Sequence, residues 1–225
     1  MHNLSQSKNQ YLLIFMEDVN YYIKIFIAII VLVNPMEGIP LFLSKTSGLT
    51  NKEKIPIIRK TSISVFIILI VALFLGRYLL EFFGIGIPAF TLAGGVIIFL
   101  ISLEMVLGKS NSGDKDTPND PNENPLNIAV VPLAIPLLAG PGPISSVILY
   151  GSKSKGIEGD LILAGIVFLV AVAVGASLNA ASRMNKFLGE TGINVLTKVT
   201  GLLIAAIAVQ LIFSGLDQMI PSLSK

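Results

Sequence analysis

The sequence contains no cysteine and no tryptophan, and its single histidine, His2, lies in a polar N-terminal stretch. Without cysteine the chain can form neither a disulfide nor a thiolate metal site, and we expect His2 to be a solvated terminal residue. HExxH, nucleophile-elbow and P-loop motifs are also absent from the sequence. The sequence therefore predicts no metal site, no cofactor, no catalytic residue, no enzyme activity and no ATP-driven step.

Charged residues are scarce. They make up 13% of the 225 residues, whereas a soluble domain carries about a quarter, and 53% of the chain is hydrophobic. The net charge of +2 suggests no nucleic-acid partner. Six stretches carry almost no charge, and each is close to the roughly 20 residues that a membrane helix needs. These stretches are 25–44, 61–76, 82–103, 124–152, 161–182 and 199–216. We predict an all-α membrane protein with six transmembrane helices.

Lysine and arginine are unequally divided between the two sides of this predicted bundle. The first, third and fifth loops together contain ten of them, and the remaining connections and termini contain six. The positive-inside rule then places the odd-numbered loops in the cytoplasm and both termini outside. The third loop includes the polar, proline-containing residues 109–125, which we predict to be a flexible cytoplasmic linker.

The two halves of the chain match without a gap when one is shifted by 106 residues, which places Pro35 on Pro141 and Arg77 on Arg183. Three helices per half is an odd number, so the second copy must be inserted upside down, as in the inverted repeats of many secondary transporters. The predicted organisation is a polar extension over 1–20, a first repeat over 21–108, the linker over 109–125 and a second, inverted repeat over 126–225. Further matches at the same shift are Gly86/Gly192, Thr91/Thr197, Gly95/Gly201 and Glu104/Gln210.

The first helix of each half carries prolines and glycines near its centre, in 34–40 and in 132–146. Proline removes an amide donor and clashes with the preceding turn, so we predict broken first and fourth helices near 34–40 and 138–145. Matched interruptions of this kind indicate a transporter site, although prolines can also kink helices for packing alone. The freed amides suit a carboxylate and the freed carbonyls an ammonium group. The predicted substrate-binding residues are Asn34, Pro35, Glu37, Gly38, Gly140, Pro141 and Gly142.

Glu37 is an acid at membrane depth, which costs at least ~2.5 kcal/mol on insertion scales. One interpretation is a proton-coupling or ammonium-binding group, and the other is a protonated structural acid that caps freed amides. Asn34, beside the break, is expected to line the site. Asn179 and Gln210 are expected to form hydrogen bonds between helices.

Four sequence motifs, which extend over most of the chain from about Tyr21, carry a resemblance to a known family. They are "NPMEGIPLFLS" at 34–44, "AGG" at 93–95, "PLAIPLLAGPGPISSVI" at 132–148 and "GETGINVLTKVTGLLIAAIAVQ" at 189–210. In these motifs the chain resembles the MarC family of bacterial and archaeal membrane proteins. The resemblance implies an inverted repeat of three plus three helices in the cytoplasmic, or inner, membrane. It also implies, for some members, transport of small neutral amino acids such as glycine and alanine.

The chain departs from the family pattern of asparagine-proline-x-glycine, because Glu37 stands at the fourth position and the glycine follows as Gly38. This departure implies a different substrate size or coupling. We expect a secondary transporter of small neutral amino acids or similar metabolites. Its expected partners are the substrate, a coupling proton or sodium ion, and the lipid bilayer. The alternative hypotheses are an exporter of drugs or other solutes and a non-transporting scaffold or assembly protein.

Overall fold

The computed structural model describes residues 19–46, 48–107, 138–154 and 156–220. All regular secondary structure in these ranges is helical, which confirms the predicted all-α class. The elements are a helical segment over 19–33, then α2 (Pro35–Lys45), α3 (Asn51–Phe82), α4 (Ile87–Leu107), α5 (Pro141–Ser152) and α6 (Gly156–Met219).

Five helices are long and apolar enough to cross a membrane: Val19–Lys45, Asn51–Phe82, Ile87–Leu107, Gly156–Met184 and Thr191–Met219. They match five of the six predicted spans. The predicted fourth span, 124–152, begins outside the described residues, as does the whole predicted linker 109–125. From that span the structure describes α5 and the three residues before it.

Helix α6 consists of two arms that meet at Gly189 (φ 62°, ψ −179°). A positive φ favours glycine because this residue has no Cβ atom to clash with the backbone. We call residues 156–188 the first arm and residues 190–219 the second arm. We predicted a fifth loop between the last two spans, and in the structure a single non-helical residue, Gly189, joins two separate helices there.

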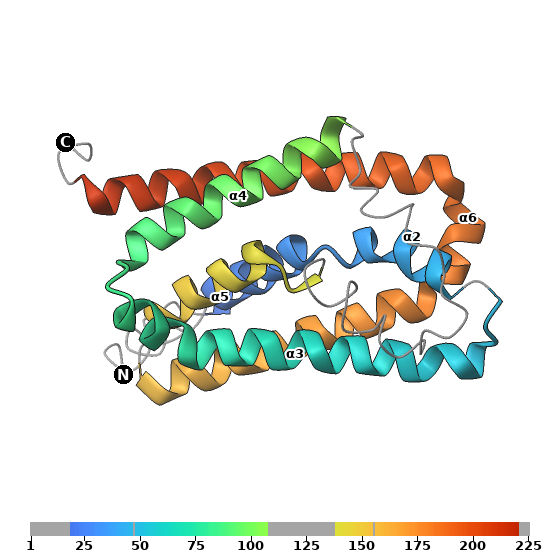
Figure 1. The fold of residues 1–225 in the computed structure, drawn as a ribbon, viewed down its shortest axis with the longest axis horizontal. Helices are drawn as coiled ribbons and strands as arrows, with labels where there is room; N and C mark the ends of the chain where they lie inside the picture. The colour runs from blue at the N-terminus through green and yellow to red at the C-terminus, as the bar shows by residue number, and fades with distance from the viewer. Residues whose placement is uncertain (1–18, 47, 108–137, 155, 221–225) are drawn as a thin grey trace, which may run out of the picture.

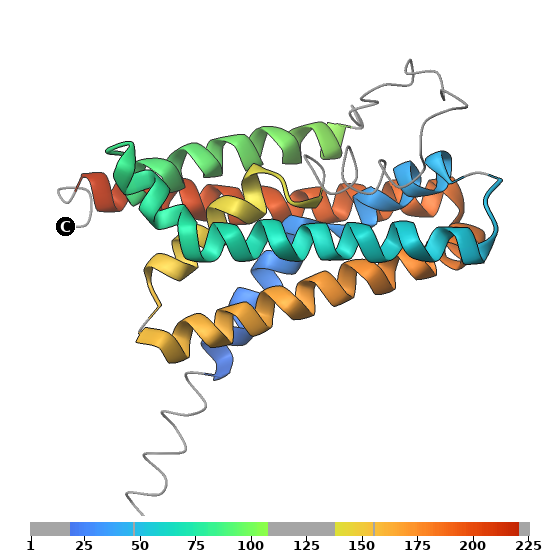
Figure 2. The same cartoon turned by 60° about the horizontal axis from the view of Figure 1, so that its bottom comes forward.

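The helices form two long pairs with shorter pieces between them (Figures 1 and 2). Helix α3 runs beside the first arm of α6, and α4 runs beside the second arm. The segment 19–33, α2 and α5 lie between these pairs, where α5 contacts both α3 and α4. The ends of these pieces that meet at Asn34 and Gly140 are thus covered by the long helices, whereas the start of segment 19–33 is exposed.

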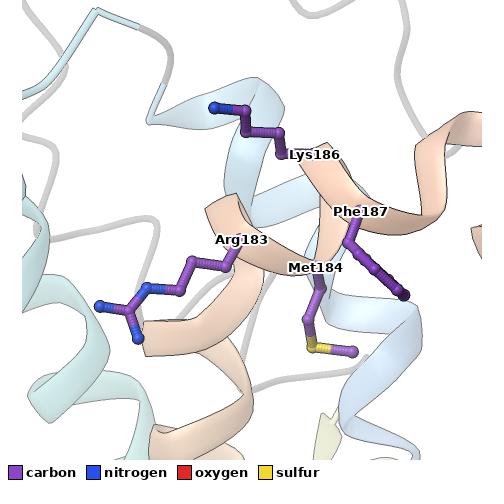
Figure 3. A pocket seen from close by; sticks show the side chains of 4 residues that line it. All are labelled: Arg183, Met184, Lys186 and Phe187. Carbon is purple, nitrogen blue, oxygen red and sulfur yellow. The ribbon is translucent and has the colours of Figure 1, made fainter.

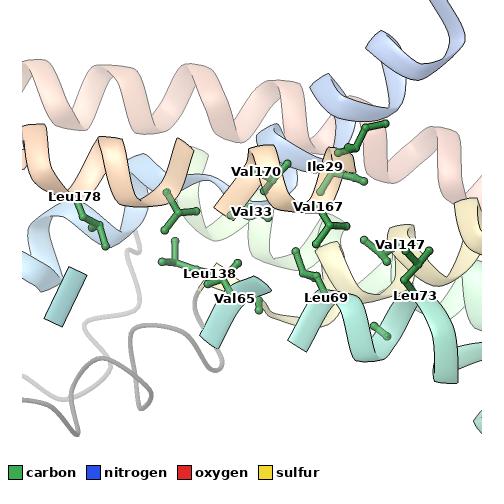
Figure 4. Packing of buried hydrophobic residues seen from close by; sticks show 14 of the residues in the cluster. Ile29, Val33, Val65, Leu69, Leu73, Leu138, Val147, Val167, Val170 and Leu178 are labelled. Carbon is green, nitrogen blue, oxygen red and sulfur yellow. The ribbon is translucent and has the colours of Figure 1, made fainter. Parts of the chain in front are cut away.

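The main hydrophobic core joins the central pieces to α3 and the first arm of α6 (Figure 4). Val33, Val65, Val147 and Val170 are at most 1% exposed. The outward faces are apolar too, and Phe213 is 67% exposed. A soluble monomer rarely exposes so much contiguous apolar surface, so the outside of this bundle suits lipid.

Helix α3 begins with the capping box that its sequence indicates, since the Thr50 N–H donates to Glu53 Oε2 at 2.7 Å. The helix then continues through Pro56, which lies one turn beyond its start. As a result α3 extends well past both ends of the predicted apolar stretch 61–76.

Candidate functional site

The first helix breaks at one residue, Asn34. Its backbone is left-handed (φ 43°, ψ 67°), and it is the one non-glycine residue in the described ranges with a positive φ. Asparagine tolerates this conformation better than most residues. Pro35 then begins α2, where its missing N–H is not needed. The predicted break over 34–40 is therefore too wide, because Glu37, Gly38 and Pro40 all lie inside α2.

The side chain of Asn34 is buried, with 2% of its surface exposed. Its Nδ2 atom donates to Glu37 Oε2 at 3.3 Å and contacts Met105 Sδ at 3.9 Å. Its Oδ1 atom is buried and accepts no hydrogen bond from the described residues. Glu104, next to Met105 on α4, lies close enough to act electrostatically on Glu37. The first break thus brings an amide and two acids together from two helices.

The second break lies at Gly140, directly before α5, where the backbone is extended (φ −78°, ψ −170°). The chain before residue 138 lies outside the described residues. Pro141 begins α5, and the Ile144 N–H donates to the Gly140 carbonyl at 3.2 Å. Residues 141–145 are therefore helical, and the predicted break over 138–145 is again too wide. Further along α5, the Ser146 side chain is 1% exposed and its Oγ atom has no partner among the described residues.

The two breaks contact each other. A Cβ atom built on Gly38 would lie 3.3 Å from the side chain of Leu138, two residues before the second break. A Cβ atom built on Gly142 would lie 3.9 Å from the side chain of Leu32, two residues before the first break, and 3.0 Å from Ile98. From this contact α2 and α5 lead away in opposite directions (Figure 1). Their N-terminal ends therefore face a common centre.

The seven predicted residues thus belong to two adjoining helix starts. Six of them are buried or half-buried, but Pro141 is exposed, so its role is to start α5. Asn179 and Gln210 are exposed on α6, which contradicts their predicted place between helices.

Three residues near the breaks were not among the predicted site residues: Glu104, Met105 and Ser146. Glu104 carried a usable signal, because it is the one acid within the apolar sequence of α4. Met105 and Ser146 could not be recognised from the sequence, because apolar and hydroxyl residues are common in membrane helices.

A separate hollow of about 730 Å³ lies beside the end of the first arm of α6 and is lined by Arg183, Met184, Lys186 and Phe187. Figure 3 shows Arg183 and Lys186 extending in different directions. Phe187 is 91% exposed, so the hollow opens to the surroundings and does not enclose a ligand. Three buried side-chain atoms lack a partner among the described residues: Asn34 Oδ1, Ser146 Oγ and Ser62 Oγ. The first two belong to the break at Asn34 and to α5, and we place the candidate site where these two elements meet.

The chemistry of the site is that of uncharged and acidic groups. No cluster of three or more histidine, cysteine, aspartate or glutamate residues occurs in the described ranges, so nothing there resembles a transition-metal centre. The site instead offers helix N-terminal amides, carboxylates, an amide oxygen and a hydroxyl. These groups bind small polar ligands and monovalent ions.

Comparison with known proteins identifies the family. The model of the MarC family integral membrane proteins matches residues 19–220. The chain is 37% identical over 208 residues to the UPF0056 membrane protein YhcE of Escherichia coli, covering 92% of this chain and 96% of that protein. It is 36% identical over 211 residues to the UPF0056 membrane protein BU267 of Buchnera aphidicola, covering 92% and 96%.

One of the similar proteins comes from an archaeon. The UPF0056 membrane protein PH0760 of Pyrococcus horikoshii is 33% identical over 205 residues, covering 89% of this chain and 96% of that protein. No solved structure matches the chain. The relatives' names describe membrane proteins and indicate no enzyme activity. The chain is a multi-pass integral membrane protein and belongs to the MarC family.

Proposed function

We propose that this protein is a secondary transporter of small neutral amino acids or similarly small zwitterionic metabolites. The observation that carries the proposal is the contact, in the interior of the bundle, between the starts of two short helices that each begin with a proline. Broken membrane helices are stable only where protein or a polar cavity covers the freed backbone groups, and such pairs form the substrate sites of many transporters. The substrate would bind where α2 and α5 begin.

Space at this centre favours a small ligand. Pro35, Gly38 and Gly142 are buried, and any side chain at Gly142 would press against Ile98 at 3.0 Å. A large drug would require the helices to separate, whereas glycine or alanine needs only a small movement. The N-terminal end of α5 supplies amides for a carboxylate. Glu37 and Asn34 supply acceptors for an ammonium group.

An inverted repeat would explain how two matching breaks come to meet. The N-caps of α2 and α5, Asn34 and Gly140, are 106 positions apart, as are the helix starts Pro35 and Pro141. The contacts between α4 and the second arm of α6 are also reciprocal at this spacing. In a two-fold interface each contact between two positions recurs with the positions exchanged.

Two glycines 106 positions apart carry this reciprocity. A Cβ atom on Gly95 would lie 2.9 Å from Ile212 and 3.1 Å from the Ala208 carbonyl. A Cβ atom on Gly201 would lie 3.1 Å from Val106 and 3.3 Å from the Ser102 carbonyl. Ser102 and Val106 are the counterparts of Ala208 and Ile212. This exchange supports a pseudo-two-fold axis between the two halves, as alternating access requires.

The proposed orientation places both termini outside the cell and the 109–125 linker in the cytoplasm, with the protein in the inner membrane. It rests on the excess of lysine and arginine in the odd-numbered connections. A reporter fused after Lys225 should be active when it requires export and inactive when it requires the cytoplasm. The reverse pattern would invert the orientation without changing the fold.

Transport itself is tested with the purified protein in liposomes. We expect uptake of labelled glycine or alanine above that of protein-free liposomes, and competition by other small neutral amino acids. Uptake measured under a membrane potential set with valinomycin, and under an imposed pH gradient, would identify which gradient drives transport. If no amino acid is taken up but cationic dyes are, the protein is an exporter of other solutes. If nothing crosses, the transporter proposal fails and a scaffold function remains.

A further inference from the structure

The break at Asn34 is rich in oxygen atoms that accept hydrogen bonds and poor in groups that donate them. The Asn34 amide directs its Nδ2 donor to Glu37 and Met105 and leaves Oδ1 buried without a partner among the described residues. Pro35 has no N–H, so the Val31 carbonyl lacks the donor that an unbroken helix would provide. A buried acceptor without a donor destabilises the folded protein, and such groups in native structures usually have a ligand or water.

Two acidic residues act on each other at this break. Glu37 is half-buried at membrane depth, and the described groups that act on its carboxyl group are Asn34, from the break itself, and Glu104, from α4. Ionisable residues inside a membrane usually pair with one another or mark an ion pathway.

We propose that the Asn34 break is a binding site for a monovalent cation or a primary ammonium group, coordinated by oxygen atoms of Asn34 and Glu37. The Val31 carbonyl is available as a further ligand, and Glu104 adds negative charge from α4. Free carbonyls at broken helices coordinate sodium in known transporter folds, and the same oxygen atoms accept hydrogen bonds from an ammonium group. The left-handed backbone of Asn34 sets this residue at the point where segment 19–33 ends and α2 begins.

The role of this site in transport rests on the proposed function. The site adds to that function by assigning the positively charged partner to one of the two breaks. That partner is either a coupling sodium ion or the amino group of the substrate. Binding of the cation can be measured without any transport, so the two proposals can fail separately.

The test uses the purified full-length protein in detergent, with its melting temperature followed by loss of the helical circular-dichroism signal. Sodium chloride and methylammonium chloride are titrated against choline chloride at constant ionic strength. Choline carries the same charge but no N–H group, and its three methyl groups shield the nitrogen. We expect sodium or methylammonium to raise the melting temperature with increasing concentration, because a ligand that binds only the folded state stabilises it. Choline should not.

The decisive variant is Glu37→Gln, which keeps the shape of the side chain and removes its charge. It should need at least about tenfold more cation for the same rise in melting temperature, since hydrogen bonds to charged groups are worth this much or more. The matched control is Glu158→Gln, an exposed residue at the start of α6, and it should respond like the wild type. Should Glu37→Gln not fold, Glu104→Gln tests the same site from α4 and should also weaken the response.

A response to sodium alone identifies an ion site, and a response to methylammonium alone identifies the site of the substrate amino group. Either supports the proposal. It is overturned if neither cation stabilises the folded wild type, or if Glu37→Gln responds as the wild type does. A melting temperature that depends on pH but on neither cation overturns it as well, since Glu37 would then exchange only protons. Amino-acid uptake without a cation response would support the proposed function and overturn the cation site. A cation response without uptake of any amino acid would support the cation site and overturn the proposed function.

Discussion

The two helix breaks share a backbone plan and differ in their side chains. In each, a non-helical N-cap residue, Asn34 or Gly140, is followed by a proline that begins a short helix. The first break has an amide and acids around it, whereas the second has glycines and serine hydroxyls. The shared backbone brings two helix N-terminal ends together. The unlike side chains make one end of the resulting site acidic and leave the other end uncharged.

A site of this kind would orient a zwitterion. The ammonium group would face the acidic break at Asn34, and the carboxylate would face the N-terminal end of α5, whose first turn contains no acidic residue. A symmetric pair of breaks could not make this distinction. The difference between the breaks is therefore what the following substitutions are designed to remove or to measure.

The largest effect is expected from Gly142→Leu, which fills the contact between the breaks. A Cβ atom at this position would lie 3.0 Å from Ile98, so a leucine must push α4 or the first break aside. We expect uptake in liposomes to be abolished and the protein to lose about 1–3 kcal/mol of stability, as overpacked cores do. The matched control is Gly165→Leu in α6, where a Cβ atom meets nothing within 4 Å. Normal uptake by Gly142→Leu would exclude the meeting point of the breaks as the substrate site.

Glu37→Gln should have the next largest effect on transport, because it removes the charge that distinguishes the first break while keeping the hydrogen bond from Asn34. If Glu37 couples transport to an ion or proton, the variant should lose uphill accumulation but retain exchange of labelled for unlabelled substrate. The measurement is the comparison of both modes in the same liposomes. Accumulation equal to the wild type, with an unchanged pH profile, would make Glu37 a structural acid.

A smaller effect is expected from a pair of substitutions that separates the backbone of Asn34 from its side chain. Asn34→Gly and Asn34→Ala both remove the buried amide, but only alanine adds the steric cost of a left-handed backbone. Asn34→Ala should therefore be less stable than Asn34→Gly by about 1–2 kcal/mol. Thermal or denaturant unfolding of both variants in detergent gives this difference. Equal stabilities would indicate that the first break has no left-handed residue.

Sequence reasoning located both breaks because proline and glycine act locally. A proline removes one backbone hydrogen bond and clashes with the preceding turn, so prolines clustered with glycines indicate where a membrane helix is prone to break. The same reasoning made both breaks too wide, because proline is also a favourable first residue of a helix. Pro35 and Pro141 begin helices, and Pro40 is accommodated on an exposed face of α2.

The partners of the breaks could not be predicted in the same way. Glu104 reaches Glu37 from a helix about seventy residues away, and that contact depends on how α4 packs. Likewise, the bend at Gly189 replaces a predicted loop, because polar residues between two spans suit a helix end as well as a turn. Local chemistry is visible in a single sequence, whereas the contacts between helices are not.

The smallest effect is expected from Ser146→Ala, which tests the uncharged break. The Ser146 hydroxyl is buried without a partner among the described residues, on the helix whose N-terminal end would face the substrate carboxylate. A single hydrogen bond to a ligand contributes about 0.5–1.5 kcal/mol, or more when the ligand is charged. We therefore expect a several-fold rise in the KM for glycine or alanine, with little change in the maximal rate or in the cation response. Ser182→Ala, at an exposed position of α6, is the control and should leave the KM unchanged. If Ser146→Ala instead changes the cation response and not the KM, the two breaks have the opposite polarity, and the carboxylate end of the substrate lies at Asn34.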